Sequence, residues 1–246
     1  MKTARQIVVV PDPAALAQEA ARRFTRLAKE AVENRGRFSA ALSGGSTPGQ
    51  LYRRLAKDTH REEMPWRHVH LFWGDERCVP PDHPGSNFGL ANEALMSHVP
   101  IPPGNVHRVR GELAPETAAQ TYAAELHAFF GAPWPRFDLV LLGLGQDGHT
   151  ASLFPGSDAI GEKARSVVAV TAQYEDRPAQ RVTLTPPAIN AARHVLFLVS
   201  GSGKAEVVQA VLEGPTGRFP AQQIRPTTGQ LGWLMDAAAA SRLAGP

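Results

Sequence analysis

Residues 137–155, FDLVLLGLGQDGHTASLFP, constrain the fold more than any other stretch of this chain. The apolar run at residues 139–144 is short and ends in glycines, which is typical of a strand buried on both faces of a parallel sheet. In such sheets, ligands bind outside the carboxyl ends of the strands. Asp147 and His149 follow the run directly. The stretch therefore predicts an α/β fold with a functional site at this strand end.

The spacing of Asp147 and His149 suggests acid–base chemistry. A histidine that is oriented by a carboxylate can take up a proton near neutral pH. Gly145 and Gly148 would let the backbone turn tightly and approach a ligand closely. The alternative is a polar loop in which the histidine only bonds the backbone. The position at a strand end favours the functional interpretation.

Three glycines in this stretch, Gly143, Gly145 and Gly148, also fit the G-x-G-x-x-G dinucleotide fingerprint. Pro155 comes too early for the long helix that the fingerprint requires, and Asp147 would place a negative charge beside the pyrophosphate. No acidic residue stands about 20 positions further on, where one would bind the ribose. We therefore disfavour a dinucleotide-dependent oxidoreductase and expect no cofactor.

A second loop has the composition of an anion site. It follows a predicted strand at residues 38–42 and precedes a helix, and it contains Ser43, Gly44, Gly45, Ser46 and Thr47. Free backbone N–H groups and the positive end of the helix dipole bind anions at such a turn. An ordinary capped helix is the alternative. The paired glycines and hydroxyls favour phosphate binding.

A third loop, residues 74–87, follows a predicted strand at 69–73 and carries charges of both signs. Asp75 and Arg77 are candidate site residues, although a solvated surface cluster is the alternative interpretation. Asn87, at the start of the next predicted helix, is a candidate substrate-binding residue. We expect Cys78 to be packed rather than reactive, because the sequence pairs it with no base.

A fourth loop, residues 200–204, follows a predicted buried strand at 195–199 and ends in Lys204. It resembles a P-loop but lacks the first glycine, which is replaced by Leu198, and the hydroxyl residue, which is replaced by Ala205. No nucleoside triphosphate is implied. Lys204 is either a phosphate ligand or a helix-surface lysine. In one parallel sheet all four loops would open on the same edge.

The remaining elements predict a single domain over residues 1–246. Further strands are expected at 7–10, 167–170 and 230–235. Helices are expected from the Asp12-Pro13 start to a stop at Gly36, then at 115–130 and 186–191. The alanine-rich segment after Met235 predicts a closing helix.

Composition excludes several classes of function. The formal net charge is only +3, and lysines and arginines are scattered, which argues against nucleic-acid binding. No apolar stretch approaches the roughly 20 residues of a membrane span, and the apolar run before Pro11 is too short for a signal peptide. The single cysteine fits a reducing, cytoplasmic setting. No metal-ligand spacing occurs, and no obligate protein partner is evident.

Four motifs together resemble the 6-phosphogluconolactonase family over nearly the whole chain. They are LSGGSTP at 42–48, WGDER with a following VP and SN at 73–87, GLGQDGHTASLFP at 143–155, and GSGK at 201–204. The resemblance implies a Rossmann-like, mostly parallel sheet with helices on both faces. It also implies metal-free hydrolysis of 6-phospho-D-glucono-1,5-lactone in the pentose phosphate pathway.

The resemblance also implies residue roles. His149 would activate water, oriented by either Asp147 or Asp75. The substrate phosphate would lie on the Gly44–Thr47 loop, with Arg181 and Lys204 adding positive charge. Arg77 would serve either the phosphate or the developing oxyanion, and both roles stay open.

Glucosamine-6-phosphate deaminase, from the same superfamily, is the nearest alternative. Deaminases typically continue the shared motif as G-H-I-A-F-N-E-P, so that their catalytic glutamate falls on Phe154 here. They also tend to have tyrosine at the position of Arg77. A non-catalytic sugar-phosphate-binding domain is a further alternative. It would need a DNA-binding module, for which we expect no room in the chain.

Overall fold

The computed structural model describes residues 5–172 and 178–244. In this part of the chain a six-stranded sheet has the order β1-β9-β8-β5-β2-β3, and all neighbouring strands are parallel. Its strands are β1 (Arg5–Val10), β2 (Phe38–Leu42), β3 (Val69–Trp73), β5 (Leu139–Leu142), β8 (His194–Val199) and β9 (Gln230–Asp236). A smaller antiparallel sheet has the order β4-β7-β6, with β4 (Asp75–Arg77), β6 (Val167–Thr171) and β7 (Gln180–Leu184).

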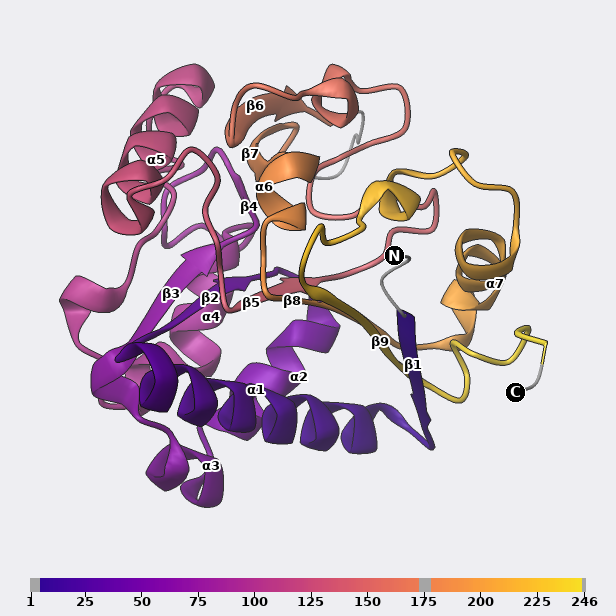
Figure 1. Cartoon of the computed structure of the whole chain (residues 1–246), viewed down its shortest axis with the longest axis horizontal. Helices are drawn as coiled ribbons and strands as arrows, with labels where there is room; N and C mark the ends of the chain where they lie inside the picture. The colour runs from indigo at the N-terminus through magenta and orange to yellow at the C-terminus, as the bar shows by residue number, and fades with distance from the viewer. Residues whose placement is uncertain (1–4, 173–177, 245–246) are drawn as a thin grey trace.

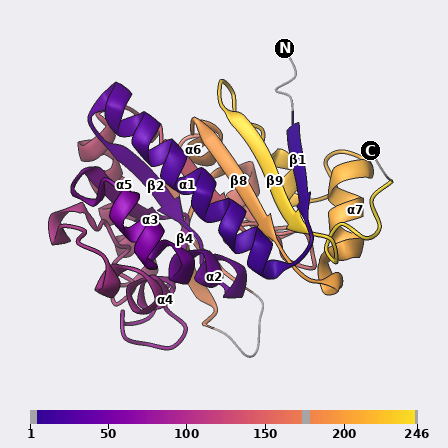
Figure 2. The same cartoon turned by 90° about the horizontal axis from the view of Figure 1, so that it is seen from below.

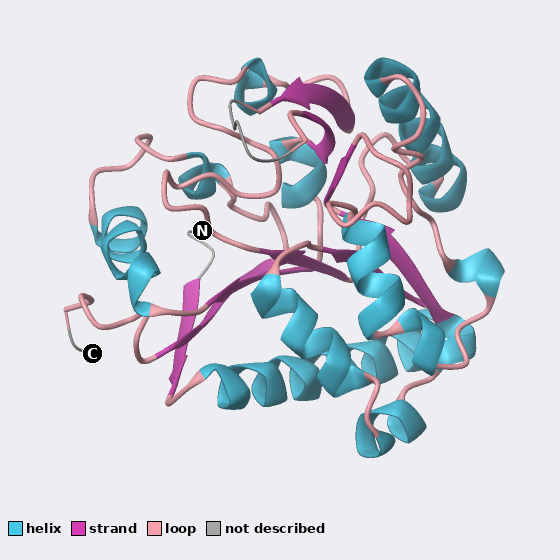
Figure 3. Cartoon of the chain, turned by 180° about the vertical axis from the view of Figure 1, so that it is seen from behind, coloured by secondary structure: helices cyan, strands magenta, loops and turns pink. Residues whose placement is uncertain are grey.

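Helices cover both faces of the large sheet, as the sequence predicts. They are α1 (Pro13–Arg35), α2 (Ser46–Leu55), α3 (Asp58–Glu63), α4 (Asn87–Ala94), α5 (Pro115–Phe130), α6 (Pro186–Asn190) and α7 (Ala205–Glu213). Helices α1 and α2 lie on one face, whereas α6, α7 and the small sheet lie on the other (Figures 1 and 3). Seen from below, α1 lies over the large sheet and runs roughly along its strands (Figure 2).

Local sequence signals explain where the elements begin and end. Asp12 caps α1 by accepting a hydrogen bond from the Ala15 N–H at 2.8 Å, and Gly36 ends the helix in the left-handed region at φ 74°. Every residue of β2 and β5 is buried, as expected for central strands covered on both faces. The predicted start and end of α1 and the predicted burial of β5 are confirmed.

Two expectations about local structure are wrong. The charged residues 75–77 form strand β4 rather than a loop. The alanine-rich segment after Asp236 forms turns instead of a closing helix. There the Asp236 carboxylate accepts the Ala239 N–H at 2.8 Å, which favours a turn. The segment is also too short to offset the cost of helix nucleation by itself.

No helix within residues 5–172 and 178–244 is long and apolar enough to cross a bilayer.

A chain of hydrogen bonds between ionisable groups lies beside β3. His70 Nδ1 is 3.1 Å from His107 Nε2, and His107 Nδ1 is 2.8 Å from Glu125 Oε1. The His107 ring stacks on Phe72 at a centroid distance of 4.2 Å. Burial, followed by the neighbouring charge of His107, lowers the pKa of His70 from 6.5 to about 4. The folded protein therefore favours neutral His70.

We expect this histidine to contribute to acid destabilisation. A lowered folded-state pKa gives a contribution that is complete above the unfolded pKa of 6.5 and is lost as the pH falls through about 4. The melting temperature should therefore fall less between pH 7 and 4 in His70→Gln than in the wild type. Burial also lowers the pKa of His60 and His194, so the difference between the two proteins isolates His70. Equal pH dependence would contradict this prediction.

Candidate active site

A pocket of about 460 Å³ lies at the carboxyl ends of β2, β3, β5 and β8. It brings together the four loops and also Arg181 from the small sheet. The predicted residues that line it are Ser43, Gly44, Gly45, Ser46, Thr47, Asp75, Arg77, Asn87, His149, Arg181 and Lys204. Of the predicted site residues, Asp147 alone is not part of this lining.

Asp147 instead contacts the histidine directly. Its Oδ1 atom lies 2.5 Å from His149 Nδ1 and accepts the His149 backbone N–H at 3.2 Å. Burial would raise the pKa of Asp147, but the hydrogen bond and positive charge of His149 outweigh it, so the pKa lies below its ordinary value. With Nδ1–H donating to this carboxylate, Nε2 is the basic nitrogen of the neutral ring. The pair has the geometry of an oriented general base.

Gly145 is required beside this pair. A Cβ atom at residue 145 would lie 2.0 Å from His149 Nδ1 and 2.6 Å from Asp147 Oδ1. Gly148 adopts a φ of 78°, and a Cβ there would collide with the Phe219 ring. The glycines of the motif therefore make room for the Asp147–His149 pair and for the segment that contains Phe219.

Asp75, the other carboxylate considered for orienting the histidine, has different contacts. It is 7% exposed, and its Oδ2 accepts the Ser152 hydroxyl at 2.7 Å. Asn87 Nδ2 donates to the Asp75 carbonyl at 2.8 Å and lies 3.4 Å from its Oδ1. Asp75 thus ties the 74–87 loop to the loop that carries His149. Ser152 was not singled out in the sequence, because a serine in an apolar segment carries no specific signal.

Glu76 is a second residue that the sequence did not single out. Its buried carboxylate accepts the backbone N–H groups of Arg77, Asn87 and Phe88, each at 2.7 Å. Burial raises the pKa of Glu76, and these hydrogen bonds oppose that effect. The carboxylate thus stabilises the amino end of α4 and fixes the position of Asn87. Its place between two charged residues, before a helix start, is the only sequence signal.

The loop after β2 presents free donors to the pocket. Helix α2 has Gly45 at its N-cap and no side-chain cap, so its first amides remain available to a ligand. Asn87 lies so close to Gly44 that a Cβ there would be 1.8 Å from Asn87 Oδ1. The Tyr52 hydroxyl holds the loop, because it accepts the Ser43 N–H at 3.0 Å and donates to the Ser43 carbonyl at 2.6 Å.

Two arginines lie opposite each other on adjacent strands of the small sheet. Arg77 of β4 pairs with Arg181 of β7 in the antiparallel register, and both line the pocket. Like charges directly opposite each other destabilise a sheet, and an anionic ligand in the pocket would relieve that repulsion. Arg77 Nη1 donates to the Gly85 carbonyl, and its Nε is buried without a hydrogen-bond partner in the described part of the chain.

The loop that carries Lys204 is fixed by a buried acid. Asp236, at the end of β9, accepts the Ser200 hydroxyl at 2.5 Å and the Gly201 N–H at 3.0 Å. Gly201 has a φ of 96° and allows the sharp turn into Lys204. No local pattern pointed to Asp236, because its partners are about 35 residues away in the chain.

No group of three or more potential metal ligands occurs among the residues that the structure describes.

Burial, followed by the neighbouring charge of Glu76, raises the pKa of Cys78 to about 11. Cys78 therefore stays a thiol at neutral pH, which agrees with the prediction that it is not reactive.

Comparison with known proteins identifies the family to which this chain belongs. Residues 11–233 match the family model described as glucosamine-6-phosphate isomerases/6-phosphogluconolactonase. A 6-phosphogluconolactonase of Synechocystis sp. is 44% identical over 225 residues, covering 89% of this chain and 90% of the relative. The structure of 6-phosphogluconolactonase from Trypanosoma cruzi has a TM-score of 0.88 at 33% identity and covers 100% of this chain and 99% of its own.

The structure of a monomeric glucosamine-6-phosphate deaminase is also similar. It has a TM-score of 0.82 at 25% identity and covers 97% of this chain and 100% of its own. A 6-phosphogluconolactonase and a glucosamine-6-phosphate deaminase thus share this fold. The chain belongs to the glucosamine-6-phosphate isomerase/6-phosphogluconolactonase family.

Proposed function

We propose that this protein is a 6-phosphogluconolactonase, which hydrolyses 6-phospho-D-glucono-1,5-lactone to 6-phospho-D-gluconate in the oxidative pentose phosphate pathway. The observation that carries the proposal is one pocket that combines His149, which Asp147 contacts from outside the pocket lining, with three elements that could bind an anion. These are the open amino end of α2, the arginines Arg77 and Arg181, and Lys204. The curated relatives named 6-phosphogluconolactonase, at 36–44% identity, support it.

In the proposed mechanism His149 acts as a general base. Nε2 takes a proton from water as the water oxygen attacks C1 of the lactone. The carbonyl oxygen gains negative charge, which fixed donors in the pocket stabilise. When the tetrahedral intermediate collapses, the bond between C1 and the ring oxygen breaks, and His149 returns the proton to that oxygen. Asp147 holds the ring and stabilises its cationic form.

The phosphate is assigned to the amino end of α2 together with Lys204 and Arg181. Arg77 has two candidate roles, which kinetics distinguish. If Arg77→Gln raises KM alone, Arg77 binds the phosphate. If it mainly lowers kcat, Arg77 stabilises the oxyanion.

Lys204→Met tests the assignment of the phosphate. A charge-assisted hydrogen bond contributes about 1.5–3 kcal/mol, so kcat/KM for the phosphorylated lactone should fall about ten- to hundredfold. Hydrolysis of unphosphorylated glucono-1,5-lactone should be nearly unchanged. The lactone is generated in situ and its disappearance is followed against the spontaneous rate. Equal losses on both lactones would show that Lys204 does not recognise the phosphate.

Deaminase activity is the second candidate, since the fold is shared. The position of the deaminase glutamate is occupied here by Phe154, whose ring lies 4.9 Å from the His149 ring. The guanidinium carbon of Arg181 lies over the Phe154 ring, 5.6 Å from its centroid. Phenylalanine cannot transfer a proton, so we expect no ammonia release from glucosamine 6-phosphate. Ammonia release together with no acceleration of lactone hydrolysis would reverse the assignment.

A further inference from the structure

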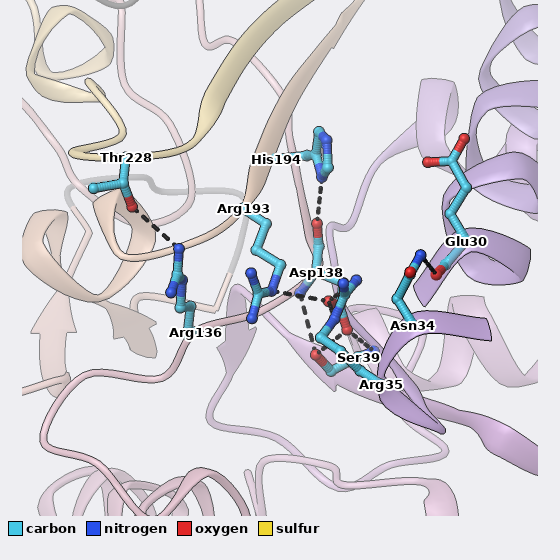
Figure 4. A network of polar contacts seen from close by, with 9 residues as sticks. All are labelled: Glu30, Asn34, Arg35, Ser39, Arg136, Asp138, Arg193, His194 and Thr228. Atoms are coloured by element: carbon cyan, nitrogen blue, oxygen red, sulfur yellow. Dashed lines mark hydrogen bonds and ion pairs between the residues drawn. The ribbon is translucent and has the colours of Figure 1, made fainter. Parts of the chain in front are cut away.

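A second pocket, of about 280 Å³, lies at the amino ends of β5 and β8, on the edge of the large sheet opposite the candidate active site. Three arginines from separate parts of the chain line it: Arg35 at the end of α1, Arg136 before β5 and Arg193 before β8. In Figure 4, Arg193 lies between Arg136 on one side and Arg35 with Asp138 on the other.

The arginines are organised around one buried carboxylate, Asp138, which is 5% exposed. Its Oδ1 accepts Nη2 and Nε of Arg35 at 2.8 and 3.1 Å and lies 3.3 Å from Arg193 Nε. Its Oδ2 accepts the N–H and the hydroxyl of Ser39 at 2.9 and 3.0 Å. Asp138 therefore holds Arg35 and Arg193 at fixed positions on the pocket wall.

Positive charge exceeds negative charge around this pocket. Glu30, the other carboxylate in the lining, accepts Arg26 Nη1 at 2.8 Å. With Arg26 included, four arginines share two carboxylates. The contact of Arg136 is with a neutral group, the Thr228 hydroxyl oxygen, at 3.3 Å (Figure 4).

Arg193 shows the effect of this imbalance. Burial, followed by the positive charges of Arg136 and Arg35, lowers its pKa, and the attraction of Asp138 does not compensate. Like charges gathered in a partly buried pocket destabilise the fold unless an anion joins them. The arrangement is therefore incomplete as an ion-pair network.

We propose that this pocket binds a small phosphorylated anion, with Arg136 and Arg193 as its main contacts. Guanidinium groups match phosphate oxygens in bidentate geometry and remain charged at all physiological pH values. The volume is just below the usual range for drug-sized ligands, about 300–1,000 Å³. It suits a phosphate group on a short carbon chain. This site is separate from the one that hydrolyses the lactone and does not depend on that proposal.

The test compares thermal unfolding and calorimetric binding of inorganic phosphate in the wild type and Arg136→Gln, in a phosphate-free buffer of low ionic strength. Without phosphate, Arg136→Gln should melt at or above the wild-type temperature, because the repulsion is relieved. With phosphate, the wild type should gain more stability than Arg136→Gln does. Its affinity for phosphate in this pocket should be about ten- to hundredfold higher than that of the variant. Phosphate binding in the active-site pocket contributes equally to both proteins and cancels.

Arg67→Gln is the matched control, because it removes one exposed arginine outside both pockets. It should gain as much stability from phosphate as the wild type. Arg193→Gln is a second variant and should lose the gain as Arg136→Gln does. The proposal is overturned if phosphate stabilises Arg136→Gln as much as the wild type. It is also overturned if Arg67→Gln loses as much of the phosphate-induced stabilisation as Arg136→Gln does, because that result would indicate a general charge effect.

Discussion

Replacing His149 with alanine is expected to lower kcat/KM for the phosphorylated lactone by about 10²–10⁴-fold, the usual contribution of general base catalysis. The effect should fall mainly on kcat, because His149 is proposed to act on the water rather than on the phosphate. Some acceleration should remain, since the donors proposed to stabilise the oxyanion are still in place. The measurement is lactone hydrolysis by the wild type and the variant, corrected for the spontaneous rate.

One further variant and one further condition make this result specific. Asp147→Asn keeps the shape of the side chain but removes the charge that stabilises cationic His149, so it should lower kcat less than His149→Ala does. Adding a chelator should leave the wild-type rate unchanged if water is activated by the histidine alone. A variant lacking His149 that hydrolyses the lactone at the wild-type rate would refute the proposed mechanism while leaving the function intact.

Gly145→Ala should cause a loss of activity that approaches that of His149→Ala, although no catalytic side chain is altered. The added methyl group would lie 2.0 Å from His149 Nδ1 and 2.6 Å from Asp147 Oδ1. Both separations are far below a normal contact, so either the pair must part or the loop must move. A displacement of about 1 Å is enough to cost roughly 100-fold in rate.

The control for this variant is Gly104→Ala, because a Cβ at Gly104 meets no atom within 4 Å. It should retain wild-type kcat and wild-type stability. The melting temperature of Gly145→Ala must be measured as well, so that unfolding is not mistaken for misalignment. A folded Gly145→Ala protein with full activity would show that the Asp147–His149 contact does not determine the rate.

Much of this architecture follows from local signals in the sequence. The strands predicted at 38–42 and 69–73 and the helix predicted at 115–130 have the same bounds in the structure. These signals suffice because burial on both faces, proline starts and glycine stops act within a few residues. The prediction that four loops meet on one edge needed only the rule that parallel strands share a direction.

The supporting residues could not be predicted in the same way. Glu76, Ser152 and Asp236 act through partners that are brought near by the fold, and no local pattern distinguishes a buried carboxylate from a surface one. The small sheet was missed for the same reason, because β4 is only three residues long and gains its stability from β7. Arg181 entered the sequence prediction through family resemblance alone, and its pairing opposite Arg77 depends on that sheet.

The pairing of β1 with β9 also bears on how the chain folds during its synthesis. Strand β1 is aligned from Arg5 with Leu231 to Val10 with Asp236, so each of its residues pairs with one that is synthesised 226 residues later. Until then a valine-rich segment has unpaired backbone groups, and even in the finished fold Val9 is 50% exposed. Such a segment is a site for unwanted strand pairing between nascent chains. Completion of this sheet edge therefore follows the synthesis of β1 by a long interval, which ties solubility during synthesis to the segment that forms β9.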